Sequence, residues 1–479
     1  MKIDEYSRLD ATALAALLDR GEVSAQELHD CARRAAAGLN PDINAIIEMF
    51  PHALHYEQDG LFAGVPFLIK DLVLHAEGVA CDGGSRLMAG RYVSAHDSEL
   101  MARFRRAGLA TLGRTTTPEL GFNASTECVL HGPTRNPWHL GHSSGGSSGG
   151  ASAAVAAGIV PVAHANDGGG SIRIPAAACG LVGLKPSRGR LPFGPDYGLP
   201  LMGQANEFVV TRSVRDAAAL LDALEGPHPG EMFNIERPAE AYALQIRRPG
   251  HRLSIAVTDR LPGSDQADPA CQAVLQQTIR TLTDLGHSVE IDAPSYDAEQ
   301  FHSANVMIWS SFLASAALGT AAALGREYDE NEVEACTRAC IDYGRRLSGL
   351  QLEQALAAMN RVSRQVATFY GKYDLLLTPT MRTPPPPIGY LNQNDPRLDA
   401  RGWYDRIFDI CPYTALFNFT GLPAISLPLG MAGDLPVGMH FAAPMGGEGI
   451  LLQLAAELES AMPWHQRTPA VHASRLAGG

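Results

Sequence analysis

The sequence lacks the segments that direct a protein into a secretory pathway or a membrane. The first five residues, Met1 to Glu5, contain no basic stretch that leads into an apolar run, so we expect no secretory signal. The most apolar window, residues 151–163, is rich in alanine and glycine and is interrupted by Gly158 and Pro161. A membrane-spanning helix needs about 20 consecutive apolar residues. We therefore expect no attachment to a membrane.

Basic residues are in the minority. The chain has 38 Lys and Arg against 51 Asp and Glu, which gives a formal net charge of −13 at pH 7. Surfaces that bind nucleic acids or anionic lipids need clusters of Lys and Arg. We therefore expect no nucleic-acid partner, and an excess of negative charge is typical of a protein that only has to stay in solution.

Cysteine is scarce and irregularly spaced. The eight cysteines, from Cys31 to Cys411, show no spacing of a disulfide framework, which is typical of a reduced, cytoplasmic compartment. Cys336 and Cys340 share one face of an expected helix, but no histidine or second cysteine pair accompanies them. We therefore predict no metal site.

The first half of the chain alternates between strand and helix patterns. Residues 65–69 form a short apolar run, residues 97–107 begin and end like a helix, and residues 109–112 are apolar again. Such alternation favours parallel pairing. We predict an α/β fold with a mixed, largely parallel central sheet covered by helices, as a single domain over residues 1–479 with its catalytic core at about 64–215.

The second half continues the same pattern with longer helices. We expect helices at about 300–324 and 349–370, a strand at 374–379 and a final strand pair at 424–427 and 437–441. Residues 226–252 are rich in proline, glycine and charge, and we expect a linker or surface excursion there.

Lys70 follows the apolar run at residues 65–69. A serine hydroxyl is a poor nucleophile until a base takes its proton, and lysine can be that base only when it is neutral. Burial lowers the pKa of a lysine because it disfavours the charged form. The sequence therefore makes Lys70 a candidate general base, although a lone lysine at a strand end usually points to solvent.

A second candidate segment consists of three glycines and a serine: Gly168, Gly169, Gly170 and Ser171. Consecutive backbone N–H groups without side chains in the way can bind an oxyanion, which amide cleavage requires. The residues that follow, 172–175, have an ordered pattern rather than that of a flexible turn.

Other interpretations of the glycine- and serine-rich segments are weaker. No Gly-Lys-Ser/Thr ends either loop, so a P-loop is excluded. Gly-x-Ser-x-Gly occurs at 141–145 and 145–149, but residues 136–140 before it are not the apolar strand that a nucleophile elbow needs. His142 and His164 flank the loops, and pairing of either with a serine stays open, although structural hydrogen bonding is the commoner role.

With these residues in place, the chain resembles the amidase signature family. The similarity is densest from about residue 64 to residue 190, and residues 184–186 and 417–424 also look like family segments. The resemblance implies a catalytic trio of lysine, a serine in a cis peptide and a nucleophilic serine, which fall on Lys70, Ser147 and Ser171. It also implies an oxyanion hole formed by the N–H groups of residues 168–171.

Two details refine this resemblance. The spacing to Ser171 suits the family's pattern and selects Ser147 over Ser143, Ser144 and Ser148. The chain has Gly168 where the family often has threonine or isoleucine, which would loosen the loop.

The resemblance also suggests a substrate class. Residues 134–138, 166–167 and 463–464 look closest to 6-aminohexanoate cyclic dimer hydrolases, and amidases that cleave urethanes and aryl amides are similar too. We expect a cofactor-free amidase, monomeric or homodimeric, that acts on a small, uncharged amide, lactam, anilide or carbamate, with Phe122 and Asn123 beside its acyl pocket. A glutamine-hydrolysing subunit that serves a tRNA-charging partner, and a non-catalytic binding protein with the same fold, remain alternatives.

Overall fold

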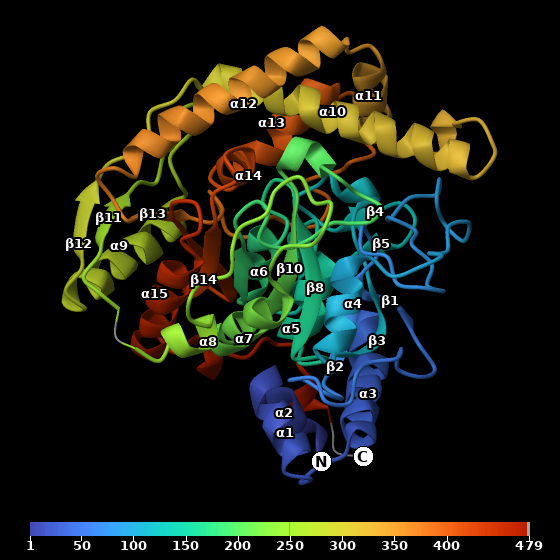
Figure 1. Cartoon of the computed structure of the whole chain (residues 1–479), viewed down its shortest axis with the longest axis vertical. Coiled ribbons are helices and arrows are strands. Elements are labelled where there is room, and N and C mark those ends of the chain that lie inside the picture. Colours follow the sequence, from blue (N-terminus) through green and yellow to red (C-terminus); the bar gives the residue numbers. More distant parts are fainter. Residues whose placement is uncertain (249, 477–479) are drawn as a thin grey trace.

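One mixed β-sheet runs through the computed structural model, which describes residues 1–248 and 250–476 (Figure 1). Its eleven strands lie in the order β1-β3-β2-β8-β10-β9-β14-β15-β13-β11-β12. Their bounds are β1 (Ile46–Met49), β2 (Pro66–Lys70), β3 (Ala110–Thr115), β8 (Val162–Asp167), β9 (Val182–Lys185), β10 (Asn206–Thr211), β11 (Ser254–Val257), β12 (Ser288–Ile291), β13 (Leu375–Pro379), β14 (Ala424–Ala432) and β15 (Leu435–Ala442). Two small sheets pair β4 (Glu127–Cys128) with β5 (Gly132–Pro133) and β6 (Arg135–Asn136) with β7 (His139–Ser143).

Helices surround the large sheet. Their bounds are α1 (Ile3–Arg8), α2 (Ala11–Asp19), α3 (Ala25–Ile43), α4 (Glu99–Arg106), α5 (Gly149–Ala156), α6 (Arg173–Cys179), α7 (Val214–Leu224), α8 (Tyr242–Gln245), α9 (Pro269–Asp284), α10 (Ala298–Ala323), α11 (Ala335–Arg345), α12 (Gly349–Phe369), α13 (Ala400–Ile410), α14 (Ala415–Phe419) and α15 (Glu448–Ala461). Figure 1 shows α10, α11 and α12 across the top of the molecule, with α1 and α2 at the opposite end beside the N-terminus.

The sequence predicts the fold class correctly and overstates the parallel character of the sheet. Parallel pairing joins β2 to β3 and β8, and it joins β11 to β12 and β13. Between these two groups the strands pair in antiparallel fashion, because β10 reverses the chain next to β8 and the β14/β15 hairpin fills the centre. The predicted α/β fold with a mixed, helix-covered sheet is confirmed.

Capping side chains fix the starts of several helices. The side chain of Asp10 accepts a hydrogen bond from Ala13 N at the start of α2, and Ser24 forms a capping box with Glu27 at the start of α3. Helix α3 continues through Pro41 and ends two residues later than that proline, at Ile43. The expected linker at 226–252 contains the short helix α8, and residue 249 lies outside the described residues.

Helix α10 is the one helix in the described part of the chain that is long and apolar enough to cross a membrane. It packs against α11 and α12, and it buries Phe301, Trp309 and Leu313. Its apolar residues therefore serve in large part as the core of the layer above the sheet.

The register of two strands positions the predicted site. Strands β2 and β8 are parallel neighbours, with Phe67 opposite Val162 and Leu68 opposite Ala163. The carboxyl ends of parallel strands meet at one edge of the sheet, where α/β proteins usually bind their ligands. Lys70 therefore lies at the same edge as the glycine loop that follows β8.

Candidate active site

Lys70 is the last residue of β2, and only 1% of its surface is exposed. Its Nζ donates hydrogen bonds to Ser147 Oγ at 2.7 Å, to Ser148 Oγ at 3.0 Å and to Asn166 Oδ1 at 2.6 Å. Burial lowers the pKa of Lys70 to about 7, and the charges of Glu207 and Asp167 only partly oppose this shift. Near neutral pH a large fraction of Lys70 is therefore neutral and can accept a proton.

The loop that carries Ser147 is shaped by close packing. The peptide bond between Gly146 and Ser147 is cis, as the family resemblance implies. A Cβ on Gly146 would lie 2.6 Å from the carbonyl oxygen of Asn123, so only glycine fits there. Thr126 Oγ1 donates to the carbonyl oxygen of Gly145 at 2.9 Å, which fixes the loop before α5 begins at Gly149.

Ser171 lies between β8 and α6, in a recess beside the Ser147 loop. The recess is lined by both Ser171 and Gly146, and Ser148 N donates to the carbonyl oxygen of Ser171 at 3.3 Å. The Ser171 hydroxyl has no hydrogen-bond partner within residues 1–248 and 250–476. The Ser147 loop, which Lys70 contacts, therefore lies beside the Ser171 loop.

The glycine loop offers three free N–H groups rather than four. Gly170 N donates to Asp167 Oδ1 at 2.6 Å, so the prediction that Gly170 helps to form an oxyanion hole is wrong for this N–H group. The N–H groups of Gly168, Gly169 and Ser171 have no acceptor in the described part of the chain. Three neighbouring free donors form a suitable nest for an oxyanion.

A buried ion pair holds this loop in place. Asp167 and Arg173 make two hydrogen bonds to each other, at 2.9 and 3.0 Å. Although burial raises the pKa of Asp167, the Arg173 guanidinium outweighs it and lowers that pKa overall. Helix α14 and the residue before it complete the network: Arg173 donates to Thr414 O and Asn418 Oδ1, and Thr414 Oγ1 donates to Gly169 O at 2.7 Å.

The same recess contains the two residues that the sequence predicts beside the acyl pocket. Phe122 and Asn123 both line it, with Ser171. Asn123 is occupied structurally, because its Nδ2 donates to Leu391 O at 3.1 Å and its Oδ1 accepts from Ser125 N at 2.9 Å. The remaining wall comes from residues that the sequence did not single out: Gly121, Ala124, Ile174, Trp309, Ile407 and Phe408.

Gly168 does not leave empty space in the loop. A Cβ at this position would lie 2.5 Å from Leu201 Cδ1 and 3.0 Å from Trp309 Cζ2. The volume of the missing side chain is therefore filled by two others. The expected loosening of the loop is countered by this packing and by the Asp167–Arg173 pair.

The two histidines near the loops have other partners. His164 is fully buried on β8, its Nε2 pairs with Glu207, and its Nδ1 accepts from the backbone N–H of Lys70 at 3.3 Å. His142 lies 2.9 Å from His139, measured between the two Nδ1 atoms. In this arrangement neither imidazole is bonded to Ser147 or Ser171.

Ser143 and Ser144, the two serines of the Gly-x-Ser-x-Gly match at 141–145, have structural partners. Ser143 Oγ is 2.6 Å from Ser125 Oγ and accepts from Gly145 N at 3.0 Å. Ser144 Oγ donates to the carbonyl oxygen of Thr134 at 3.3 Å. The nucleophile-elbow interpretation therefore has no support at 141–145. The central serine of the match at 145–149 is Ser147, which Lys70 contacts.

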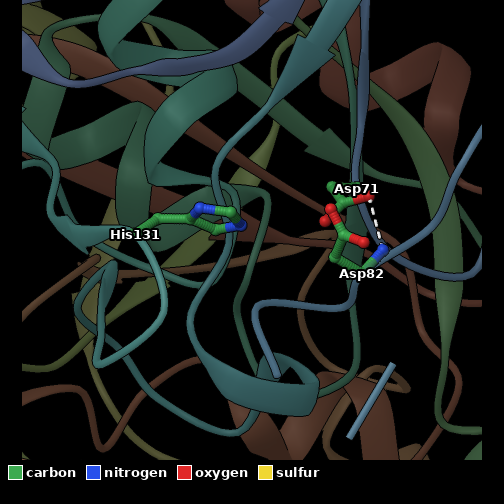
Figure 2. Close-up of side chains that lie close together, drawn as sticks. All are labelled: Asp71, Asp82 and His131. Atoms are coloured by element: carbon green, nitrogen blue, oxygen red, sulfur yellow. Dashed lines mark hydrogen bonds between the residues drawn. The ribbon is translucent and has the colours of Figure 1, made fainter. Parts of the chain in front are cut away.

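Asp71, Asp82 and His131 form a cluster that the sequence analysis missed (Figure 2). Their ligand-type atoms lie within 4.8 Å of one another, and Figure 2 shows the His131 ring directed toward the two carboxylates. Such a set could hold a metal ion. However, Arg114 Nη1 donates to Asp71 at 2.9 Å and to Asp82 at 2.7 Å, so a cation of the protein already compensates this charge.

Comparisons with known proteins find similarity over almost the whole chain. The 6-aminohexanoate-cyclic-dimer hydrolase of Paenarthrobacter ureafaciens is 37% identical over 98% of this chain and 97% of its own length. A solved structure of 6-aminohexanoate cyclic dimer hydrolase complexed with substrate has a TM-score of 0.92 and 36% identity, and the match covers 97% of this chain and 99% of that one. A bacterial aryl acylamidase of the amidase signature enzymes has a TM-score of 0.83 at 27% identity, over 96% and 97% of the two chains. The family model described as Amidase matches residues 13–452, and the chain therefore belongs to the amidase family.

Proposed function

We propose that this protein hydrolyses the C–N bond of carboxamides through an acyl-enzyme on Ser171, with Lys70 as the base and Ser147 as the proton relay. The observation that carries the proposal is the 2.7 Å hydrogen bond between Lys70 Nζ and Ser147 Oγ, made by a buried lysine whose pKa is lowered to about 7. A lysine with this pKa can gain and lose a proton in each turnover at neutral pH.

The proposed reaction has two stages, acylation of Ser171 and hydrolysis of the acyl-enzyme. Neutral Lys70 takes the proton of the Ser147 hydroxyl while Ser147 takes that of Ser171, and Ser171 Oγ attacks the carbonyl carbon. The free N–H groups of Gly168, Gly169 and Ser171 hold the resulting oxyanion. The proton returns through Ser147 to the amide nitrogen, the C–N bond breaks and the amine leaves. Water then attacks the ester by the same route and releases the carboxylic acid.

The chemistry needs no cofactor, because base, relay, nucleophile and oxyanion donors all come from the chain. All eight cysteines are buried and free, which supports a reducing, cytoplasmic setting. The proposed partner is a small-molecule amide.

The lining of the recess supports an uncharged substrate. None of the described residues that line it has an ionisable side chain, and Phe122, Ile174 and Phe408 make it largely apolar. The charged ends of free glutamine would find no counter-ion there, which disfavours the glutamine-hydrolysing subunit. The relatives named for a cyclic amide dimer and for aryl acylamides point to the same class: linear amides, lactams, anilides or carbamates.

Ser171→Ala tests the assignment. We expect the variant to fold like the parent and to lose at least about a thousandfold in kcat/KM on an aryl amide, because removing the nucleophile of such a system costs several orders of magnitude. Ser143→Ala is the matched control and should retain activity. A Ser171→Ala variant within tenfold of the parent would refute the mechanism, and an unmodified parent that hydrolyses no amide, anilide, carbamate or ester on its own would favour the two alternatives.

A further inference from the structure

Trp309, in the middle of α10, closes the recess beside Ser171. It is 5% exposed, and its ring stacks on Phe122 with the centroids 4.4 Å apart and the planes 14° apart. Both rings line the recess, and Ile407 and Phe408 of α13 line it as well. The far wall of the recess is therefore built from large apolar side chains of elements distant in sequence.

The Trp309 indole also lies directly on the glycine loop. A Cβ on Gly168 would be 3.0 Å from Trp309 Cζ2 and 3.1 Å from Cη2, which is closer than nearly all real contacts of this kind. On Gly169, a Cβ would be 3.0 Å from Phe408 Cζ. The loop and the aromatic side chains are thus fitted to each other, and the indole, together with Leu201, occupies the space that a side chain at position 168 would take.

The wall is held in position from behind. Trp403 is fully buried, and its Nε1 donates to the carbonyl oxygen of Phe122 at 3.0 Å. Tyr404 contacts Phe408, with ring centroids 4.5 Å apart. Since protein interiors are close-packed, a substrate group cannot push these rings aside without displacing their neighbours.

We propose that Trp309 determines specificity by limiting how long an acyl chain the substrate can place beside Ser171. The inference rests on the proposed function, because it takes Ser171 as the residue that is acylated. The indole blocks the recess at the depth of the glycine loop, and the lining offers no charge. The acyl groups that fit are slim, uncharged and short or flat.

Trp309→Ala tests this on p-nitroanilides with straight acyl chains from acetyl to octanoyl. Each additional buried methylene contributes roughly fourfold in binding. In the variant, the ratio of kcat/KM for octanoyl over acetyl substrate should rise at least tenfold above that of the parent. Trp309→Leu should give a smaller rise in the same direction. Met307→Ala is the matched control, because Met307 lies on the same helix but lines a different cavity, and its ratio should stay at the parent value.

Two further measurements keep the result decisive. Labelling of Ser171 by a fluorophosphonate at the parent rate shows that a variant is folded and that its nucleophile is intact. A labelled Trp309→Ala variant with an unchanged acyl ratio overturns this inference alone. A variant whose preference changes instead along a series of acetyl amides with larger amines overturns it too, because the recess would then hold the leaving group. Failure of Ser171 to label in the parent overturns the proposed function itself.

Discussion

Exchanging Asn166 for Asp is the sharpest test of how Lys70 acts as a base. The Asn166 Oδ1 atom lies 2.6 Å from Lys70 Nζ and accepts its hydrogen bond without a negative charge. Burial therefore keeps the pKa of Lys70 at about 7. A carboxylate of the same shape would stabilise the ammonium form, and an opposite charge at such distances shifts a pKa by about 1 to 3 units.

The size of the effect follows from the fraction of neutral lysine. At pH 7 about half of Lys70 is neutral in the parent. After a rise of about 1 to 3 units in its pKa, the neutral fraction at pH 7 falls roughly 5- to 500-fold, and kcat/KM should fall with it. Activity should recover as the pH is raised to about 10, since the relay itself is intact.

The assay is the pH profile of kcat/KM on an aryl amide from pH 5.5 to 10.5. The parent should rise about tenfold per pH unit below its inflection near 7 and level off above it. Asn166→Ala is the control, because it also loses the bond from Asn166 Nδ2 to Leu72 O but adds no charge. An Asn166→Asp profile with the inflection of the parent would show that Lys70 is not the group that titrates.

Three other results would test the same site. Lys70→Ala and Ser147→Ala should each lose most of the rate, and the double variant should lose little more, because residues of one relay act as a unit; additive losses would contradict the relay. A fluorophosphonate should label Ser171 in a peptide map, and label on Ser143 would revive the nucleophile elbow. Lys70→Met should change how the unfolding free energy depends on pH. Between about pH 7 and 10.5, Lys70 is mostly neutral in the folded parent but protonated in the unfolded chain. The unfolding free energy of the parent should therefore rise relative to that of the variant by up to about 1.4 kcal/mol per pH unit in this range. The unfolding free energies of the parent and of Lys70→Met would be measured by urea denaturation. If their difference does not change between about pH 7 and 9.5, the pKa of Lys70 in the folded protein is not depressed.

The segments that form the candidate site could be predicted because their signals are local. A lysine at the end of an apolar strand, a glycine-rich loop and a serine at a fixed spacing can all be recognised in a linear sequence. The sequence indicates the partners of Lys70 only in part. The family spacing does not select Ser148, and Asn166 belongs to a subgroup motif that does not mark it as an acceptor for Lys70 Nζ. Which of several neighbouring polar side chains turns inward depends on backbone geometry that spacing alone does not fix.

The walls of the recess could not be predicted in the same way. Trp309, Ile407 and Phe408 line the same recess as Ser171 only because α10 and α13 lie next to the Ser171 loop. Similarly, the antiparallel direction of β10 depends on its pairing with β8 and β9 rather than on its own residues. Contacts of this kind are decided by how distant elements dock, and one sequence does not record them.

The bonds from Arg173 to α14 also bear on how the enzyme is made. Through Arg173, the Ser171 loop is hydrogen-bonded to Thr414, which lies 241 positions after Arg173, and to Asn418. A growing chain on the ribosome carries Lys70, Ser147 and Ser171 long before these partners have been synthesised. Until they are synthesised, the Arg173 guanidinium lacks two of its acceptors, and the Gly169 carbonyl group lacks the hydrogen bond from Thr414 Oγ1. We therefore expect amide cleavage to begin only after Asn418 has been synthesised, and a chain that is cut short before Thr414 to carry Ser171 on an unfastened loop.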